Sequence, residues 1–335
     1  MQKRISRVAI IAAALCFVPM LAYAQWTWTP QTGRFVNIKK LPKETAELQI
    51  EFARGKMLSG DYKDAMQETV KFRNFYGDSP LADQNQFLRG EICMAQGKLL
   101  DAAKEFQQVV TGFPNTSLYD QVIKKQYEIG DKLYEQGKAK MKKKFRVFRK
   151  KPFKSAIEVY SMVINNQPFT KAAAEAQYKV GLCRQTRKEY TEAAFEYRRV
   201  IEDYASSDWV DDATYALAMC YYEAARPPEY DQSPSQLAVS AIDDFKRRFP
   251  QDERGAALDE KRKEMRDSIA AQRVKTAQFY AKRRDFDAAR IYYKLVAEKF
   301  GDTGSAEKAQ KWLAGNPAPE STAADKALRS TQKPS

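Results

Sequence analysis

Few residues of this 335-residue chain could carry out chemistry. There is no histidine, which excludes imidazole acid–base catalysis, histidine-dependent nucleophile triads and histidine metal ligands. Acids are paired at Asp211-Asp212 and Asp243-Asp244, but adjacent helical residues point to different sides, so we interpret both pairs as solvated. The sequence contains no nucleophile elbow, phosphate loop or metal-ligand cluster. We therefore predict that the protein is not an enzyme and uses no cofactor.

The cysteines are too few and too scattered to form a disulfide framework. Cys93, Cys183 and Cys220 lie in separate predicted helices, and a fourth, Cys16, lies near the start of the chain. Without Cys16, which lies in a predicted signal peptide, three cysteines remain, and an odd number in separate segments is a poor framework for disulfides. We predict that the three later cysteines are buried, small apolar residues.

A basic run covers residues 138–154, with ten Lys or Arg residues and no acid. Phe145 and Phe148 lie among these charges. Such a segment can dock on anionic lipid headgroups or on an acidic protein face. It can equally be a solvated helical extension whose aromatic residues pack back on the chain. We expect no nucleic-acid binding, because residues 1–24, described next, are predicted to be an export signal. The candidate anionic-surface residues are Lys142, Lys143, Lys144, Arg146, Arg149, Lys150 and Lys151.

Residues 1–24 have the features of a secretory signal peptide. A basic start is followed by the apolar stretch Val8 to Phe17 and by Ala22-Tyr23-Ala24, an A-x-A cleavage signal. Cys16 offers a second interpretation, a lipid attachment site, but the large Leu15 precedes it and we favour cleavage after Ala24. The next segment, 25–42, has alternating Trp and Thr residues and is predicted to be an extended arm. It could cap the first repeat or tether the chain to a partner or membrane surface.

One amphipathic helix, predicted over residues 189–204, is the element that the others repeat. Tyr190, Ala193, Tyr197, Val200 and Tyr204 follow each other in steps of three and four residues, so they share one helix face. Charged residues occupy the other sides. A helix with one apolar stripe must bury that stripe against neighbours, and the chain supplies neighbours by repeating the pattern.

Six copies of this pattern can be aligned on a small residue at the centre of the stripe. A large residue lies four positions after it, an apolar residue seven after it and usually an aromatic residue eleven after it. Two of the intervals are 37 residues, a period typical of helical-hairpin solenoids. The six central residues are Ala65, Ala102, Ala156, Ala193, Ala238 and Ala289.

A preceding helix completes each hairpin. Gly90 and Gly181 lie twelve residues before Ala102 and Ala193, and a small residue at that place lets two helices approach closely. This pattern resembles the tetratricopeptide repeat. The predicted fold class is therefore all-α, a tetratricopeptide-like helical-hairpin solenoid of about five to six repeats over residues 43–313.

Several boundaries follow from local composition. Ser79 before Pro80 predicts a helix N-cap followed by proline at the first helical position. A Pro-rich loop is predicted at 226–234, where repeat proteins often carry partner contacts. One long helix is predicted from 255 to 284 and a closing helix from 306 to 313. Residues 314–335 are predicted to be disordered.

Three stretches resemble the BamD family of outer-membrane β-barrel assembly factors. The turn at 113–119 is similar to the family's Tyr-Pro-x-Ser-x-Tyr, and Asp231-Gln232-Ser233 is similar to the end of its Asp-Arg-Asp-Gln-Ser loop. Residues 277–303 are similar to its last repeat. Two departures are Tyr230, where the family has Arg, and the poor lipidation site at Cys16.

The resemblance implies a periplasmic scaffold at the inner face of the outer membrane. It implies docking on the POTRA domains of a BamA-like barrel-inserting protein through the C-terminal repeats, and reception of unfolded barrel proteins at the N-terminal repeats. On this basis the predicted partner-binding residues are Asp231, Gln232, Arg266, Arg273 and Tyr280.

A different class of repeat protein is the alternative. CpoB-like periplasmic proteins have similar repeats and coordinate cell-wall synthesis with envelope constriction. They carry a coiled coil ahead of the repeats, and residues 25–42 contain no heptads. We therefore rank this alternative second.

Overall fold

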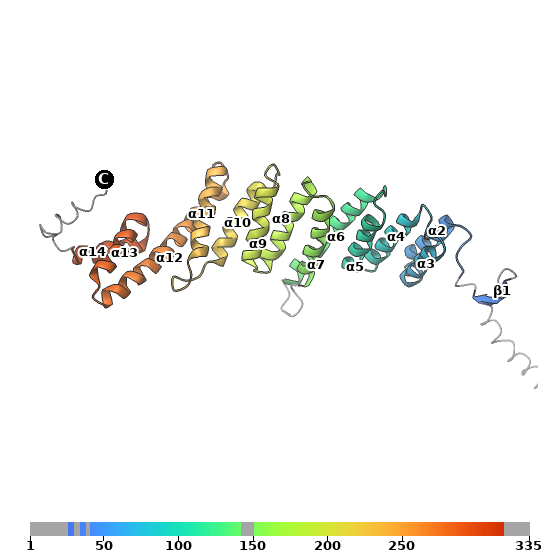
Figure 1. Ribbon diagram of the computed structural model, residues 1–335, viewed down its shortest axis with the longest axis horizontal. Coiled ribbons are helices and arrows are strands. Elements are labelled where there is room, and N and C mark those ends of the chain that lie inside the picture. Colours follow the sequence, from blue (N-terminus) through green and yellow to red (C-terminus); the bar gives the residue numbers. More distant parts are fainter. Residues whose placement is uncertain (1–25, 30–33, 38–40, 142–150, 318–335) are drawn as a thin grey trace, which may run out of the picture. The chain divides into compact units, whose positions relative to one another are not determined.

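The computed structural model describes residues 26–29, 34–37, 41–141 and 151–317. The described part is helical apart from two short strands, which confirms the all-α repeat fold (Figure 1). Its elements are β1 (Trp26–Thr29), β2 (Arg34–Asn37), α2 (Ala46–Leu58), α3 (Tyr62–Phe75), α4 (Ala82–Ala95), α5 (Leu99–Gly112), α6 (Tyr119–Met141), α7 (Lys151–Asn166), α8 (Lys171–Thr186), α9 (Tyr190–Asp203), α10 (Val210–Ala224), α11 (Ser233–Arg248), α12 (Arg254–Lys282), α13 (Phe286–Lys299) and α14 (Gly304–Gly315).

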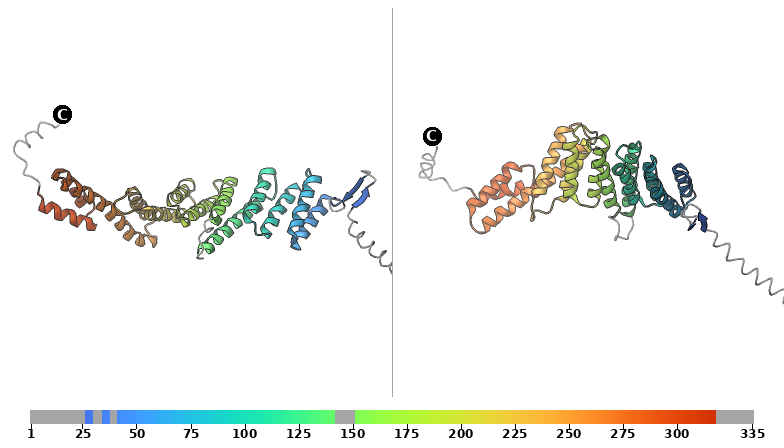
Figure 2. Two further views of the ribbon diagram at one scale, coloured as in Figure 1. Left: turned by 90° about the horizontal axis from the view of Figure 1, so that it is seen from below. Right: turned by 45° about the vertical axis from the view of Figure 1, so that its right-hand side comes forward.

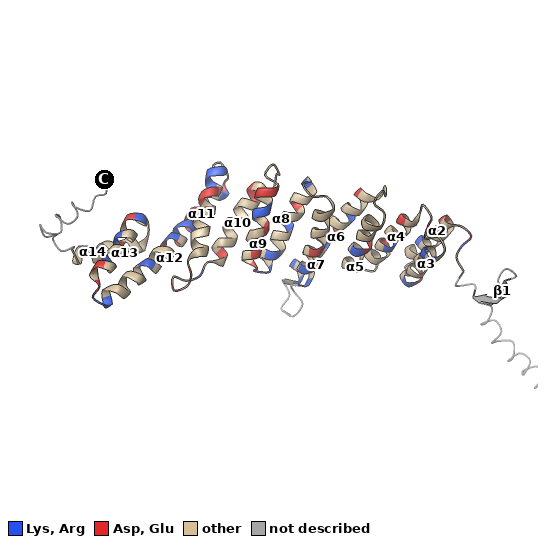
Figure 3. Ribbon diagram, viewed as in Figure 1, with Lys and Arg blue, Asp and Glu red and all other residues tan. Residues whose placement is uncertain are grey.

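The chain divides into two compact units, Met1–Leu133 and Tyr134–Ser335. In the first unit, α2 packs on α3 and α4 packs on α5, each pair forming a hairpin. In the second unit, α8–α9, α10–α11 and α12–α13 are the corresponding pairs, and α14 closes the array by packing on α12 and α13. Figure 2 shows α8 to α11 stacked side by side. Figure 3 shows acidic and basic positions interspersed along these helices.

The aromatic stripes form the cores of both units. Phe106 in the first unit and Tyr197 and Phe245 in the second are fully buried, together with the central Ala102, Ala193 and others of the template. Burying one such side chain stabilises the fold by roughly 1.5–3 kcal/mol. The stripe prediction is thus confirmed, and the periodicity of the sequence identifies the core.

The hairpin glycines lie directly against these rings, as predicted. A Cβ atom on Gly90 would lie 2.5 Å from the Phe106 ring, and one on Gly181 would lie 2.6 Å from the Tyr197 ring. Any side chain here would separate the two helices. Glycine is therefore required for contact rather than for backbone conformation.

The register of the third hairpin differs from the prediction. Gly137 of α6 faces Phe153, and its Cβ would lie 2.7 Å from that ring. Our template placed Ala156 at the centre, which assigned the ring position to Tyr160 instead. Because steps of three and four residues repeat every seven, a shift of seven residues keeps the same face buried, and the stripe alone could not distinguish the two registers.

One further prediction about local structure needs correction, and one gains detail. Helix α4 begins at Ala82 rather than at Pro80, and the Ser79 hydroxyl accepts a hydrogen bond from the Leu81 amide within the preceding turn. At the N-terminal arm, β1 and β2 pair with each other as an antiparallel hairpin that sets Trp28 opposite Phe35. The long helix and the closing helix correspond to α12 and α14.

Several predictions fall on residues outside the described part of the chain. These are the signal peptide with Cys16, the centre of the basic run at 142–150 and the tail from 318 onward. Within the described part, Cys93, Cys183 and Cys220 are buried and form no disulfide, as predicted. None of the described helices combines the length and the apolar composition that a membrane span needs.

Candidate partner-binding surface

The Pro-rich loop between α10 and α11 is built around the buried side chain of Gln232, which is 2 % exposed. Its Nε2 atom lies 3.2, 3.0 and 3.1 Å from the backbone carbonyl oxygens of Arg226, Pro227 and Tyr230. Its Oε1 atom accepts hydrogen bonds from the hydroxyls of Ser235 and Ser268, at 2.9 and 2.8 Å. One amide therefore satisfies the turn of the loop and joins it to α11 and α12.

An ion pair also joins this loop to α12, and a groove lies between the loop and the helix. Glu229 forms an ion pair with Lys275 of α12. Between them the loop and α12 enclose a groove of about 510 Å³. Tyr222 lines this groove and donates a hydrogen bond to Glu264 of α12 at 2.7 Å. The loop is thus held in one position on the long helix.

The outer side of the loop is exposed and presents Arg226, Tyr230 and Asp231. Tyr230 is 55 % exposed, and the Arg226 guanidinium lies over its ring at 5.9 Å. Hydrogen bonds from the Ser233 amide and hydroxyl hold the pKa of Asp231 below its ordinary value. Arginine and tyrosine, which this loop exposes, are residue types enriched at protein interfaces.

The five predicted partner-binding residues have different environments in the structure. Asp231 is exposed, whereas the Gln232 side chain is buried and anchors the loop. The proximity of both residues to a partner stays a prediction. Arg266 binds both carboxylate oxygens of Asp302 and the Lys299 carbonyl, and it lies over the Phe300 ring at 5.2 Å. These contacts hold α12 against the end of α13.

Arg273 and Tyr280 continue the same side of α12, each seven residues after the previous residue. Arg273 lies over the Phe300 ring at 5.7 Å. Tyr280 is stacked on Tyr292 of α13, with ring centroids 5.6 Å apart. Both residues are half-buried in the α12–α13 contact. Their packing explains their place in the fold, and their proximity to a partner stays a prediction.

The adjacent acids Asp211 and Asp212 are not independent solvated groups, contrary to our expectation. Both pair with Arg254 at the start of α12, at 3.3 and 2.5 Å, and Asp252 pairs with the same guanidinium at 2.6 Å. The guanidinium also lies over the Tyr215 ring at 5.0 Å. This cluster fastens α10 to α12, so the acids have a structural role.

The predicted anionic-surface residues are only partly described. Lys151 is exposed at the first position of α7, and the other six lie in the 142–150 segment outside the described residues. Their binding to anionic lipid headgroups remains a prediction.

A repeated polar clamp, which sequence reasoning missed, joins the two helices of a hairpin. In each case the Nε2 atom of a glutamine donates a hydrogen bond to the carboxylate of the glutamate nineteen residues later, at 2.6–2.8 Å. The three pairs are Gln49–Glu68, Gln86–Glu105 and Gln177–Glu196. The first two pairs are separated by the same 37 residues as the stripes. That spacing was the available signal, but our template recorded only apolar positions.

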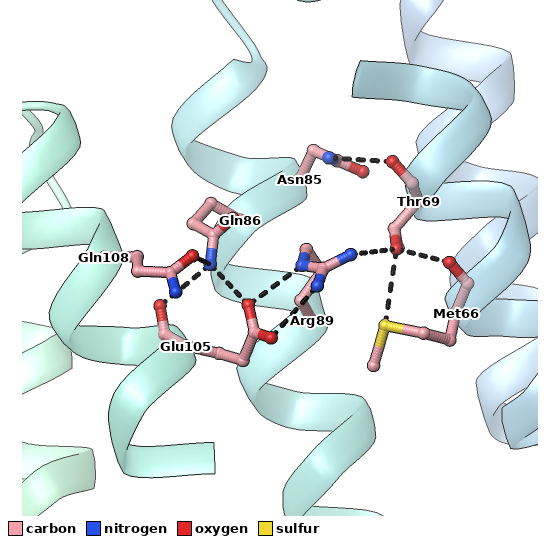
Figure 4. Close-up of polar contacts among 7 residues, drawn as sticks. All are labelled: Met66, Thr69, Asn85, Gln86, Arg89, Glu105 and Gln108. Carbon is pink, nitrogen blue, oxygen red and sulfur yellow. Dashed lines mark hydrogen bonds and ion pairs between the residues drawn. The ribbon is translucent and has the colours of Figure 1, made fainter. Parts of the chain in front are cut away.

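The second of these clamps is extended by an arginine, as Figure 4 shows. Arg89 binds both carboxylate oxygens of Glu105, at 2.9 and 3.0 Å, and its other nitrogen lies 3.4 Å from the Thr69 hydroxyl of α3. Gln86 also lies 3.1 Å from the amide oxygen of Gln108. The network therefore connects α3, α4 and α5.

A groove of about 960 Å³ lies beside this network in the first unit. Its apolar lining includes Met66, Val70 and Cys93, and Glu105 of the network lines one side. Four lysines line it and only two acids, so it suits an extended segment with apolar and acidic groups. The lining lysines are Lys63, Lys71, Lys98 and Lys104.

Acid is expected to weaken the first unit through Glu105. Burial alone would raise the pKa of this carboxyl, but hydrogen bonds from Arg89 and Gln86 outweigh burial and lower the pKa below its ordinary value. The stabilisation is therefore complete above the unfolded-state pKa, about 4.3, and is lost as pH falls through the lower folded-state value. In Glu105→Gln we expect the free energy of unfolding to depend less on pH below about pH 5.

Urea unfolding of the full chain at a series of pH values would measure this. Glu51→Gln, a change of the same kind at an exposed site of the same unit, is the matched control. A Glu105→Gln variant with the same pH dependence as the parent chain would contradict the assignment.

In comparisons with known proteins, the chain matches a protein family and a curated relative. The profile of the family described as "YfiO: Outer membrane lipoprotein" matches residues 130–315, more than half of the chain. The outer membrane protein assembly factor BamD of Caulobacter vibrioides is 23 % identical over 154 residues, which cover 46 % of this chain and 50 % of that protein. The chain thus spans about half the length of this curated relative.

The chain also matches solved structures at low identity. A tetratricopeptide repeat protein from Parabacteroides merdae shares 16 % identity over 80 % of this chain and 97 % of its own, with a TM-score of 0.30. The MamA protein shares 17 % identity over 64 % of this chain and 95 % of its own, with a TM-score of 0.33.

Proposed function

Because the chain belongs to the YfiO family of outer membrane lipoproteins, we propose that it is a non-catalytic scaffold of the outer-membrane β-barrel assembly machinery. The similarity to an assembly factor from Caulobacter vibrioides supports this role. In this proposal the protein works at the periplasmic face of the outer membrane. Among the described residues, no group of three or more Cys, Asp or Glu side chains is arranged to hold a metal ion.

The observation that carries the proposal is the loop held by Gln232. Its anchoring leaves Arg226, Tyr230 and Asp231 exposed on a fixed backbone. A preordered loop loses little conformational entropy on binding, which favours a specific protein contact. We propose that this loop docks on a POTRA domain of a BamA-like barrel-inserting protein.

The groove of the first unit supports the second part of the role. An unfolded barrel protein offers extended segments in which apolar residues alternate with polar ones. The apolar residues and lysines along the groove fit such a segment. We propose that unfolded outer-membrane proteins bind there. The basic run at 138–154 is proposed to contact anionic lipid headgroups.

The double variant Tyr230→Ala/Asp231→Ala tests the docking loop. Exposed aromatic residues at the centre of an interface often contribute strongly to affinity, so we expect at least about tenfold weaker binding to the purified POTRA domains of the same organism's BamA-like protein. Isothermal titration with the mature full-length chain measures the affinity. Ile291→Ala, at an exposed apolar residue on α13, is the control and should bind like the parent chain.

The same variant should still bind an unfolded barrel segment, because the proposed groove for that segment lies in the other unit. Equal loss of both activities would point to a folding defect, which circular dichroism would detect. Unchanged POTRA affinity in the double variant would exclude the loop as the docking site.

A further inference from the structure

The first helix of the repeat array, α2, can be aligned with α4 by the polar clamp. Gln49 of α2 and Gln86 of α4 make the same pair of hydrogen bonds to the residue nineteen positions ahead, one to its backbone carbonyl and one to its carboxylate. The alignment makes Leu48 equivalent to Asn85, and Phe52 equivalent to Arg89. The role of these two positions can therefore be read from α4.

In α4 the two positions face the preceding repeat. The Asn85 side chain donates to the Thr69 carbonyl of α3 at 3.1 Å, and Arg89 reaches the Thr69 hydroxyl. In α8, aligned through Gln177, the equivalent residues are Ala176 and Val180, which are 0 % and 3 % exposed. Helix α8 packs on α7, the second helix of the preceding hairpin. These two positions of a first helix thus lie at the contact with the second helix of the preceding repeat.

In α2 the same positions are apolar and partly exposed, and the Lys43 ammonium lies over the Phe52 ring at 4.0 Å. Leu48 is 46 % exposed and Phe52 is 37 % exposed, and they border a groove of about 550 Å³. The end helix of a repeat array normally presents a polar outer face, because nothing packs on it. Leucine and phenylalanine at inter-repeat positions are instead typical of an interface.

The charges around this groove indicate what it binds. Glu44 and Glu51 line it and are exposed, and Glu47 is exposed on the same helix end, whereas Lys43 is the one lysine in the lining. An acidic rim repels anionic lipid and attracts a basic protein segment. The apolar pair has the spacing that receives a helix, four residues apart.

We propose that this surface, Leu48 and Phe52 with their acidic rim, binds a basic amphipathic helix of a partner protein. The helix would dock as the second helix of a preceding repeat docks in the rest of the array. The site lies at the start of the first unit, whereas the Pro-rich loop with its proposed POTRA contact belongs to the second unit. It therefore assigns the scaffold a second protein partner.

The chain itself provides a suitable probe, a stapled peptide with the sequence of α7, residues 151–166. In the structure α7 packs on α8, and its buried residues include Phe153, Val159 and Tyr160. Its charged residues are Lys151, Lys154 and Glu158, so the helix is apolar on one face and basic overall. The staple keeps the peptide helical. We expect saturable binding of the labelled peptide to the mature full-length chain, measured by fluorescence anisotropy.

The variant Leu48→Glu/Phe52→Glu should bind this peptide at least about tenfold more weakly, because it places charge where the apolar face docks. Both side chains are exposed, so the fold should tolerate the change, and circular dichroism checks this. Leu237→Glu, at a leucine of similar exposure in the second unit, is the control and should not change the affinity. Glu44→Lys/Glu51→Lys should also weaken binding of the basic peptide, because it changes the charge of the rim from negative to positive.

Three results would overturn the proposal. The first is no saturable peptide binding, or binding that the double variant retains. The second is binding of the parent chain, lost in the variant, to vesicles of phosphatidylglycerol, because that would make lipid the occupant. The third is self-association by sedimentation that the variant abolishes, because that would make a second copy the occupant.

Discussion

Gly90→Ala is expected to destabilise the protein by about 1–3 kcal/mol, although it adds only one methyl group. On helix propensity alone the change should stabilise α4 by roughly 0.5–1 kcal/mol. The new Cβ, however, would lie 2.5 Å from the Phe106 ring, and that ring is fully buried and packed on Phe87. The ring has no free space to enter, so the hairpin α4–α5 must separate. Urea or thermal unfolding of the full chain measures the loss.

Gly55→Ala is the matched control for this substitution. Gly55 is also a helical glycine in a first helix of the same unit, but a Cβ there has no neighbour within 4 Å. We expect Gly55→Ala to be neutral or stabilising. In the Gly90→Ala background, Phe106→Leu should restore part of the loss, because the two changes act on one contact. If both glycine variants had the same stability, the close-contact explanation would be wrong.

Gln232→Leu is expected to release the Pro-rich loop and to weaken POTRA binding by at least about tenfold, without removing an exposed contact residue. Leucine is similar in size, but it leaves the hydroxyls of Ser235 and Ser268 without their acceptor and the loop carbonyls without their donor. Each unsatisfied buried polar group costs about 1–3 kcal/mol. The loop is therefore expected to lose its single conformation rather than repack around the new side chain.

Amide hydrogen exchange of residues 226–234 measures this release directly. Exchange should accelerate in Gln232→Leu and stay unchanged in Asp231→Asn, because Asp231 is exposed and contacts only Ser233. Rapid exchange with undiminished POTRA affinity would mean that the order of the loop is irrelevant to docking. Unchanged exchange would refute the anchoring role.

The two experiments test two kinds of contact, one within a repeat and one between segments distant in sequence. Gly90 concerns how two helices of one repeat meet, and the repeat pattern of the sequence was sufficient to predict that contact. Gln232 concerns how a loop is held on a helix distant in sequence. The sequence identified the residue through family resemblance, but not its anchoring role, since a glutamine in a loop is usually exposed.

Long-range ion pairs were the main feature that the sequence left open. Arg254 lies more than forty residues from Asp211 and Asp212, and nothing in the periodicity relates them. Arg266 and Asp302 are also far apart in sequence, yet Arg266 binds both carboxylate oxygens of Asp302. Charged residues on solvent-facing sides have no period that specifies a partner. Their pairing depends on the positions of whole helices.

The sequence by itself determined the repeat, because a stripe at steps of three and four residues can be buried only by a neighbouring helix and because Gly90 and Gly181 mark where two helices touch. Only the tertiary structure decided the register of the third hairpin, since a seven-residue shift of Phe153 against Tyr160 preserves the same face. It also decided which residues of the array remain uncovered. Leu48 and Phe52 are apolar residues of α2, and both are exposed.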